Sequence, residues 1–200
     1  MPSGTWPIGL IYIPASGIMT KDKWLTKEDV LSILRKIDRE LEGLPRSIKL
    51  YCVGGTYLSL SDVKGASKDL DFILSRRDVR AISGIASEIE ITDRVRLDLF
   101  PDGEMKGYQL IGYEAHAQKV PLSFDHIEVY QPDLVDFVLT KAIAGRAEDY
   151  EDIARLVKDK RQVPRTKLSA RFKELKFSPD EEAEIKRKFH AFIKDFYRSK

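Results

Sequence analysis

A short apolar segment followed by two glycines constrains the fold of this chain most strongly. Residues 48–53 are rich in β-branched and other apolar side chains, which predicts a strand. Gly54, Gly55 and Thr56 follow, and residues 57–60 continue as a short helix. Glycines let backbone N–H groups approach an anion closely, and a helix N-terminus adds positive potential. The segment therefore predicts a strand, a glycine turn and a helix that suit phosphate binding.

Two acidic side chains lie at the start of a second predicted strand, residues 70–74, one directly before it and one within it. Asp69 and Asp71 flank Leu70, and because side chains alternate along a strand, both carboxylates point to one face. Two adjacent like charges raise each other's pKa unless a cation lies between them. Mg²⁺ prefers oxygen ligands, often one or two carboxylates completed by water and substrate phosphates. The pattern favours a magnesium site on this face.

A third acid, Asp98, lies in a predicted strand over residues 95–100, where Leu97 and Leu99 face the opposite side. If this strand pairs with that of the two earlier aspartates, three carboxylates converge. Such a triad holds two metal ions and orients or deprotonates an attacking hydroxyl for displacement at phosphorus. Each piece alone is common, because a Gly-Gly pair after a strand is usually a turn and a lone strand aspartate is often solvated. Their combination is what indicates an active site.

The remaining segments predict a mixture of helices and strands. A helix is expected near 26–41, another near 79–89, and a strand over 126–130. After Pro132, which suits the first position of a helix, four helical segments follow, over 133–144, 148–160, 165–175 and 179–198. The expected fold class is α+β, a small mixed sheet flanked by helices with a C-terminal helical lobe. The expected parts are an N-terminal arm (1–25), a catalytic domain (26–131) and the helical lobe (132–200).

The spacing of these motifs resembles the nucleotidyltransferase superfamily that includes DNA polymerase β. Its members join a hydrophobic strand, Gly-Gly or Gly-Ser, a spacer, an Asp-hydrophobic-Asp strand and a third Asp; here the spacer between Gly55 and Asp69 is the thirteen residues 56–68. The resemblance implies a nucleotidyltransferase fold that binds Mg²⁺, two ions being expected, and an NTP. The implied catalytic and metal-binding residues are Asp69, Asp71 and Asp98. The implied nucleotide-binding residues of this region are Gly54, Gly55, Thr56 and Lys68.

Residues 141–153 extend the resemblance into the helical part of the chain. They are similar to the Lys…Arg-x-(Lys)-Asp-x-x-Asp signature of the AbiEii-type toxin branch and related uncharacterised prokaryotic nucleotidyltransferases. This similarity implies that Lys141, in catalysis and nucleotide binding, and Asp149 complete the site, and that a cognate antitoxin is a partner. The chain departs from the pattern at Gly55, where serine is usual, and at Glu148, where a basic residue is common. The second departure bears on nucleotide preference and on activity itself.

Lys141 and Asp149 also have a structural interpretation. At helical spacing, both charges fall on largely apolar faces. A half-buried charge needs a partner, so the two residues pair with each other, or with Arg146 and Asp152, or they bind phosphate. The alternatives are compatible, because a lysine held by one carboxylate at a cleft wall still reaches a triphosphate.

The formal net charge of +2 hides an asymmetry along the chain. Residues 1–154 carry 19 basic and 25 acidic side chains, a net of −6, whereas residues 155–200 carry 15 and 7, a net of +8. Residues 155–176 hold nine Lys or Arg and two Asp or Glu. Such a segment is more often a solvated helix face than a nucleic-acid site, but beside a phosphoryl-transfer centre it suits RNA, in particular a tRNA end.

The longest apolar run near the start, residues 9–13, is cut by Pro14 and lacks a basic segment before it. This predicts neither a signal peptide nor a membrane span, and a cytoplasmic protein is expected. The single cysteine, Cys52, has no partner for an internal disulfide, and the three histidines lack the spacing of a zinc site.

The sequence as a whole predicts a Mg²⁺-dependent nucleotidyltransferase that moves a nucleoside monophosphate from an NTP to a hydroxyl of RNA, tRNA or protein. Two alternatives stay open at this point. One is a catalytically silent module of the same fold that acts as a binding or regulatory protein. The other is a small-molecule modifier of the aminoglycoside-adenylyltransferase type, for which a basic helical segment is not needed.

Overall fold

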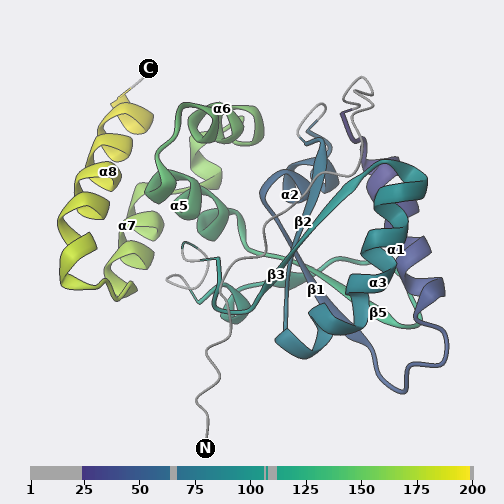
Figure 1. The fold of residues 1–200 in the computed structure, drawn as a ribbon. Coiled ribbons are helices and arrows are strands. Elements are labelled where there is room, and N and C mark those ends of the chain that lie inside the picture. Colours follow the sequence, from purple (N-terminus) through teal and green to yellow (C-terminus); the bar gives the residue numbers. More distant parts are fainter. Residues whose placement is uncertain (1–23, 64–66, 106, 108–111, 199–200) are drawn as a thin grey trace, which may run out of the picture.

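The computed structural model describes residues 24–63, 67–105, 107 and 112–198, so most of the arm expected over 1–25 lies outside the described residues. The described strands form one mixed sheet in the order β3-β2-β1-β5-β4 (Figure 1). They are β1 (Ile48–Val53), β2 (Asp69–Leu74), β3 (Arg96–Pro101), β4 (Gln118–Lys119) and β5 (Ile127–Gln131). β1 is antiparallel to β2 and parallel to β5, and β2 is parallel to β3. The mixed sheet with its helices confirms the expected α+β class.

Two helices, α1 (Lys27–Glu40) and α3 (Arg76–Asp93), cover one face of this sheet (Figure 1). Their apolar side chains share one buried cluster with the even-numbered residues of two strands, Ile48, Leu50, Cys52, Leu70, Phe72 and Leu74. Because neighbouring strand residues point to opposite faces, the odd-numbered residues point away from α1 and α3. Asp69 and Asp71 therefore lie on the opposite face of the sheet.

The Asp38 carboxylate of α1 fixes the start of β5. It accepts hydrogen bonds from the backbone N–H groups of Asp125, His126 and Ile127, at 3.2, 2.7 and 3.1 Å. The carbonyl of His126 in turn accepts the N–H of Ile48 at 2.8 Å. One buried carboxylate thus connects α1 to the place where β1 and β5 pair in parallel. These two strands are far apart in the sequence, so no short loop holds them together.

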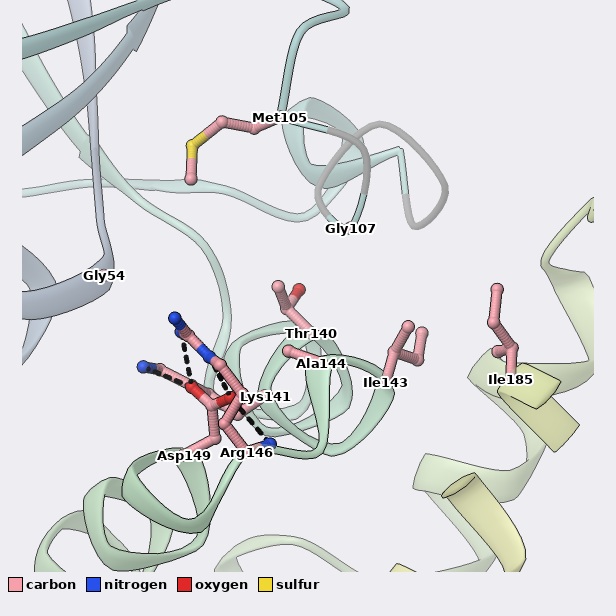
Figure 2. Close-up of a pocket in the computed structure, with 10 residues that line it drawn as sticks. All are labelled: Gly54, Met105, Gly107, Thr140, Lys141, Ile143, Ala144, Arg146, Asp149 and Ile185. Carbon is pink, nitrogen blue, oxygen red and sulfur yellow. Dashed lines mark hydrogen bonds and ion pairs between the residues drawn. The ribbon is translucent and has the colours of Figure 1, made fainter. Parts of the chain in front are cut away.

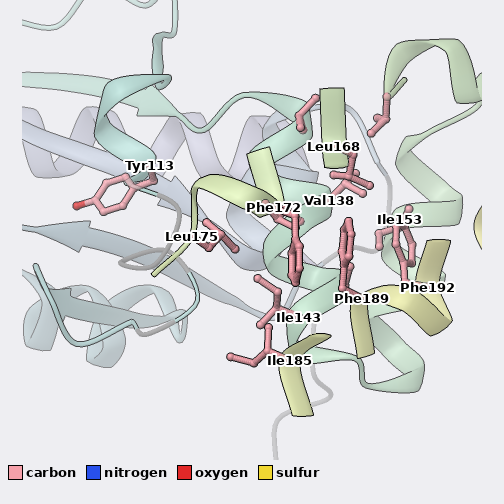
Figure 3. Packing of buried hydrophobic residues seen from close by; sticks show 14 of the residues in the cluster. Tyr113, Val138, Ile143, Ile153, Leu168, Phe172, Leu175, Ile185, Phe189 and Phe192 are labelled. Atoms are coloured by element: carbon pink, nitrogen blue, oxygen red, sulfur yellow. The ribbon is translucent and has the colours of Figure 1, made fainter. Parts of the chain in front are cut away.

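In the described part of the chain, four α-helices follow the sheet: α5 (Leu134–Ala144), α6 (Ala147–Leu156), α7 (Arg165–Glu174) and α8 (Pro179–Arg198). They pack around a second apolar cluster, in which the rings of Phe172 and Phe189 stack with centroids 3.8 Å apart (Figure 3). The cluster also contains Tyr51, Val53 and Ile73. The helical layer therefore packs against the face of the sheet that carries the aspartates. No helix of the described residues is both long and apolar enough to cross a membrane.

Two predicted helix boundaries are wrong, and both errors involve an aspartate. Pro132 does not begin α5, because Asp133 is its N-cap and accepts the N–H of Asp136 at 2.7 Å. The helix predicted over 148–160 ends at Leu156. Asp159 then accepts the N–H of Arg161 at 2.9 Å and starts a separate 3₁₀ turn, η2 (Lys160–Gln162). In both places a carboxylate accepts a nearby backbone N–H group and so sets where a helix or turn begins. The spacing of apolar residues along a helix does not reveal such a bond.

Candidate functional site

β2 and β3 bring the three predicted aspartates to one face of the sheet. In their parallel register, Asp71 lies opposite Asp98, and Asp69 lies opposite Arg96. The two strands therefore pair, which is the condition on which the expected convergence of the three carboxylates depended. The same register places Arg96 two positions before Asp98 on the same face, and the Arg96 Nε lies 2.8 Å from Asp98 Oδ1.

The three aspartates do not form a preformed metal cluster. Among the described residues, no three Asp, Glu, His or Cys side chains lie close enough to hold a metal ion together. Asp69 and Asp71 line a cleft, and Asp98 is absent from the described residues that line it. The three carboxylates thus share one face of the sheet without forming a metal-binding group among the described residues. Asp98 pairs with Arg96 of its own strand.

The Asp71 carboxyl group is strongly perturbed. Burial raises its pKa to about 7, repulsion from Asp69 and Asp98 adds to the rise, and a hydrogen bond from Gly55 opposes it. In that bond the Gly55 N–H donates to Asp71 Oδ2 at 3.2 Å. A partly buried carboxylate that neighbouring acids repel is stabilised by a cation, and Mg²⁺ takes one or two carboxylates together with water and phosphate oxygens. The donor set of Asp69 and Asp71 therefore fits a divalent ion.

Gly54, the first residue of α2 (Gly54–Leu60), makes room for Asp71. Its φ is +52°, and a Cβ atom at this position would lie 2.4 Å from Asp71 Oδ2. Only glycine combines that backbone angle with so close an approach. Gly54 and Gly55 both line the cleft. The Gly-Gly pair therefore has a second role besides the predicted phosphate contact, because it leaves room for the Asp71 carboxylate and donates a hydrogen bond to it. The sequence pattern did not reveal this role.

Thr56 lies behind the site. Its side chain is fully buried, and its hydroxyl oxygen accepts the backbone N–H of Asp71 at 2.6 Å. The prediction that this hydroxyl contacts a nucleotide phosphate does not agree with that placement. Thr56 instead ties α2 to β2 and fixes the backbone of Asp71.

A partly buried ion-pair network joins α5 to α6, and Figure 2 shows its residues Lys141, Arg146 and Asp149. Lys141 and Arg146 line the same cleft as Asp69 and Asp71. Lys141 Nζ lies 2.9 Å from Asp149 Oδ1 and 2.8 Å from Asp152 Oδ2, and Arg146 Nε lies 2.9 Å from Asp149 Oδ2. Burial opposes the charge of Lys141, but the bonds to Asp152 and Asp149 outweigh it and raise the pKa of the ammonium group. Burial also opposes the charge of Asp149, yet Arg146 and Lys141 hold the pKa of this carboxyl below its usual value.

The structure therefore shows the ion-pairing alternative for Lys141 and Asp149. Asp149 is fully buried, and its two oxygens accept hydrogen bonds from Lys141 and Arg146. Its carboxylate therefore faces these two side chains and not the cleft that holds Asp69 and Asp71. Lys141 also lines the cleft, where its charge offsets a small part of the rise in the pKa of Asp71. Its ammonium group is thus held by two carboxylates at the wall of the site.

The cleft between β2 and α6 has a volume of about 630 Å³. Its charged lining residues are Lys68, Asp69, Asp71, Lys141, Arg146, Glu148, Glu151, Asp152 and Arg155. A smaller pocket of about 280 Å³ shares Gly54, Lys141 and Arg146 with it and is otherwise largely apolar, with Ile143 and Ile185 among its walls (Figure 2). A polar cleft and an apolar pocket therefore meet at the Lys141 network.

Two lining residues have no counterpart in the predicted site. Ser67 is buried, and its hydroxyl lies 2.6 Å from the carbonyl oxygen of Asp69 and 3.0 Å from Asp69 Oδ1, either of which can accept its proton. Trp24 lines the cleft from the start of α1. A serine two residues before an aspartate is a local signal for such a bond, whereas the position of Trp24 depends on packing between distant segments.

The chain belongs to the family described as nucleotidyltransferase of unknown function (DUF6036), which matches residues 30–196. This agrees with the superfamily that the sequence motifs indicated, and the description specifies neither a substrate nor the AbiEii-type branch. No curated protein matches the chain. The crystal structure of an antigenic nucleotidyltransferase-like protein from Paracoccidioides brasiliensis is similar over 81% of this chain and 94% of that chain, with 14% identity and a TM-score of 0.45.

Proposed function

We propose that this protein transfers a nucleoside monophosphate from an NTP to a hydroxyl acceptor, with pyrophosphate as the leaving group. The observation that carries the proposal is the position of Asp71. Its half-buried carboxylate lies against Gly54 and Gly55, and on the same face it is close enough to Asp69 and Asp98 for both to raise its pKa. Membership of a nucleotidyltransferase family supports the same reaction.

Asp69 and Asp71 would hold Mg²⁺, because both carboxylates line the cleft. The metal would neutralise the charge of the triphosphate and stabilise the attacking and leaving oxygens. Asp98, opposite Asp71 in the register, would orient or deprotonate the acceptor hydroxyl once its carboxylate leaves Arg96. This assignment requires that Arg96 and Asp98 separate, a step that an exposed ion pair opposes only weakly.

Cationic and backbone groups around the aspartates would bind the triphosphate. Gly54 and Gly55 line the cleft, and Lys141 and Lys68 line it as well. An ammonium group recognises phosphate as a compact point charge. Because Asp149 is bonded within the network, we propose for it a positioning role toward Lys141 in place of the nucleotide contact that the resemblance implied.

Labelling of acceptors tests the reaction directly. The purified protein with Mg²⁺ and labelled NTPs is expected to label RNA, protein or a small acceptor, and EDTA is expected to stop it. Asp69→Ala and Asp71→Ala should abolish labelling, whereas Asp93→Ala, at the exposed end of α3, is the matched control and should retain it. Labelling that survives in the Asp71→Ala variant would refute the assignment.

An RNA or tRNA acceptor is proposed from the basic segment 155–176. Part of that charge is used internally, because Arg171 is buried and lies 3.0 Å from Asp136, and Lys167 lies 3.3 Å from Asp133. Neutralising the exposed Arg165, Lys173 and Lys176 is therefore the appropriate test. An RNA modifier would lose affinity in this variant and with added salt, whereas a modifier of small molecules would not.

The AbiEii-type, toxin-like role is a finer proposal, supported by the pattern of residues 141–153. It predicts that expression of the protein arrests growth, that Asp71→Ala relieves the arrest, and that a cognate antitoxin suppresses it. Growth that is unaffected by the active wild-type protein would remove the toxin assignment and leave the transfer reaction in place.

A second candidate is a catalytically silent binding or regulatory module. The observation that favours it is the internal satisfaction of the site, since Lys141 contacts two carboxylates and Asp98 contacts Arg96. Calorimetry separates the two candidates. An active enzyme should bind NTP with Mg²⁺ and lose that affinity with Asp71→Ala, whereas a silent module should bind no nucleotide.

A further inference from the structure

Trp24 is unusually exposed for a large aromatic side chain. Among the described residues, three large hydrophobic side chains are exposed: Trp24 at 52%, Ile91 at 79% and Tyr150 at 36%. Of these, Trp24 alone lines the carboxylate cleft in the described part of the chain. An exposed aromatic ring at the wall of a polar cleft is suited to stack against a planar ligand.

The backbone next to Trp24 is firmly anchored. Leu25 is buried in the cluster between α1, α3 and the sheet. Its N–H donates to the carbonyl of Ser67 at 2.8 Å, and its carbonyl accepts the hydroxyl of Ser59 at 3.3 Å. The capping box of Thr26 then starts α1. The indole is thus presented by a fixed piece of backbone, which lowers the entropy lost when a ligand stacks on it.

The same anchor connects Trp24 to the proposed metal site. The carbonyl of Ser67 accepts the N–H of Leu25, and the Ser67 hydroxyl lies 2.6 Å from the carbonyl oxygen of Asp69 and 3.0 Å from Asp69 Oδ1. Lys68, the residue between Ser67 and Asp69, has its Nζ 5.3 Å from the centroid of the Trp24 ring. An aromatic face, an ammonium group and a carboxylate thus meet at one wall of the cleft. A cation over an exposed ring contributes only about 0.5–1 kcal/mol, and Lys68 itself lines the cleft in which a phosphate would bind.

We propose that Trp24 is the stacking platform for a nucleobase and that Lys68 pairs with the phosphate attached to the same nucleoside. The inference rests on the proposed function and names a part of its substrate site. The base belongs either to the NTP or to the end of a single-stranded RNA acceptor, because both present a flat base beside a phosphate. Stacking on an indole accepts any base, so the platform contributes affinity without strong base selection.

Fluorescence of Trp24 tests the proposal in the full-length chain. The sequence contains two tryptophans, so Trp6→Phe leaves Trp24 as the single indole. In the free protein, acrylamide should quench its emission, as expected for an exposed ring. With Mg²⁺ present, NTPs or a short single-stranded oligoribonucleotide should quench it further, whereas inorganic triphosphate should not. The ligand that quenches identifies the source of the base.

Binding affinities provide the second measurement. By calorimetry, Trp24→Leu should weaken the base-bearing ligand about 10-fold or more and leave triphosphate binding unchanged, while Trp24→Phe should retain most of the affinity. Ile91→Ala, an exposed apolar residue elsewhere, is the matched control and should have no effect. Equal affinity of wild type and Trp24→Leu for both NTP and oligonucleotide would overturn the proposal. So would emission from Trp24 that acrylamide does not reach.

The outcomes also separate this proposal from the proposed function. If triphosphate and NTP bind equally well with Mg²⁺ and both depend on Asp71, the metal and phosphate site stands. In that case Trp24 does not stack on the base of the NTP. If oligonucleotide binding is also independent of Trp24, the stacking proposal is wrong. If neither triphosphate, NTP nor oligonucleotide binds to the wild type, the proposed function and the stacking proposal both fail.

Discussion

Replacing Lys141 by methionine removes the cation that joins α5 to α6 and preserves most of the side-chain length. The variant leaves Asp149 fully buried with Arg146 as its remaining charged partner, at 2.9 Å. Removing one partner of a buried ion pair costs about 3–5 kcal/mol. Because Arg146 still compensates part of the charge, the expected loss is at the lower end, about 3 kcal/mol, which lowers the Tm of a chain of this length by about 6–12 °C.

Urea denaturation followed by circular dichroism measures this loss. The matched control is Lys186→Met, which removes an exposed lysine paired with Glu182 within α8 and should change the unfolding free energy by less than about 0.5 kcal/mol. A loss below about 1 kcal/mol for Lys141→Met would refute the structural role of the network, since exposed ion pairs contribute that little. Phosphate binding would then be the main role of Lys141.

The pH dependence of the Lys141→Met effect follows from Asp149. Burial opposes the charge of this carboxyl, but Arg146 and Lys141 hold its folded-state pKa below the ordinary value of 3.8. A depressed folded-state pKa contributes stability that is fully present above the unfolded value and is lost as the pH falls through the folded value. The difference between wild type and variant should therefore be complete at neutral pH and shrink below about pH 4. A difference that stays constant through this range would contradict the assignment.

Three further substitutions test individual contacts by the same denaturation assay. Gly54→Ala should destabilise the protein by about 1–3 kcal/mol and weaken Mg²⁺ binding, because its Cβ would lie 2.4 Å from Asp71 Oδ2; Gly84→Ala, with no atom within 4 Å, should instead stabilise α3 by up to about 1 kcal/mol. Thr56→Val should cost about 1–3 kcal/mol, because the Asp71 N–H loses its acceptor, and serine there should restore it. Asp38→Ala should lower the free energy of unfolding by about 2–3 kcal/mol, and Asp38→Asn by less, because three N–H groups lose their shared acceptor. If Asp38→Ala or Thr56→Val is as stable as the wild type, the hydrogen bonds of that side chain contribute nothing to stability.

The central part of the fold follows from one-dimensional patterns. The alternation of apolar residues in 48–53 and 70–74 determines which face packs against α1 and α3. The same alternation places Asp69 and Asp71 together on the other face, and the structure agrees. Helical periodicity likewise located α5 to α8, because an amphipathic stripe repeats within each helix and does not depend on distant segments.

The contacts within the site depend on register and on close approach, which such patterns do not contain. Arg96 competes for Asp98 because the strand places both side chains on one face, and no spacing rule says which partner a carboxylate prefers. Thr56 is buried because α2 begins at Gly54 itself, which turns its hydroxyl toward β2. Asp38 looks like an ordinary polar residue of a helix until β5 is placed beside β1. Each of these roles appears only once two distant segments are packed together.

A triphosphate that binds at Lys141 meets an ammonium group on which two carboxylates already occupy two of the three N–H donors. Asp149 is fully buried and is also held by Arg146, whereas the Asp152 side chain is 17% exposed and lies 2.8 Å from Lys141. If phosphate takes the place of one carboxylate, we therefore expect that carboxylate to be Asp152. Removing its charge with Asp152→Asn should strengthen binding of inorganic triphosphate about 2- to 5-fold, the equivalent of one weak ion pair. Weaker binding in calorimetry would show that Asp152 itself takes part in the site, through the metal, and that Lys141 is not the group on which the phosphate exchanges.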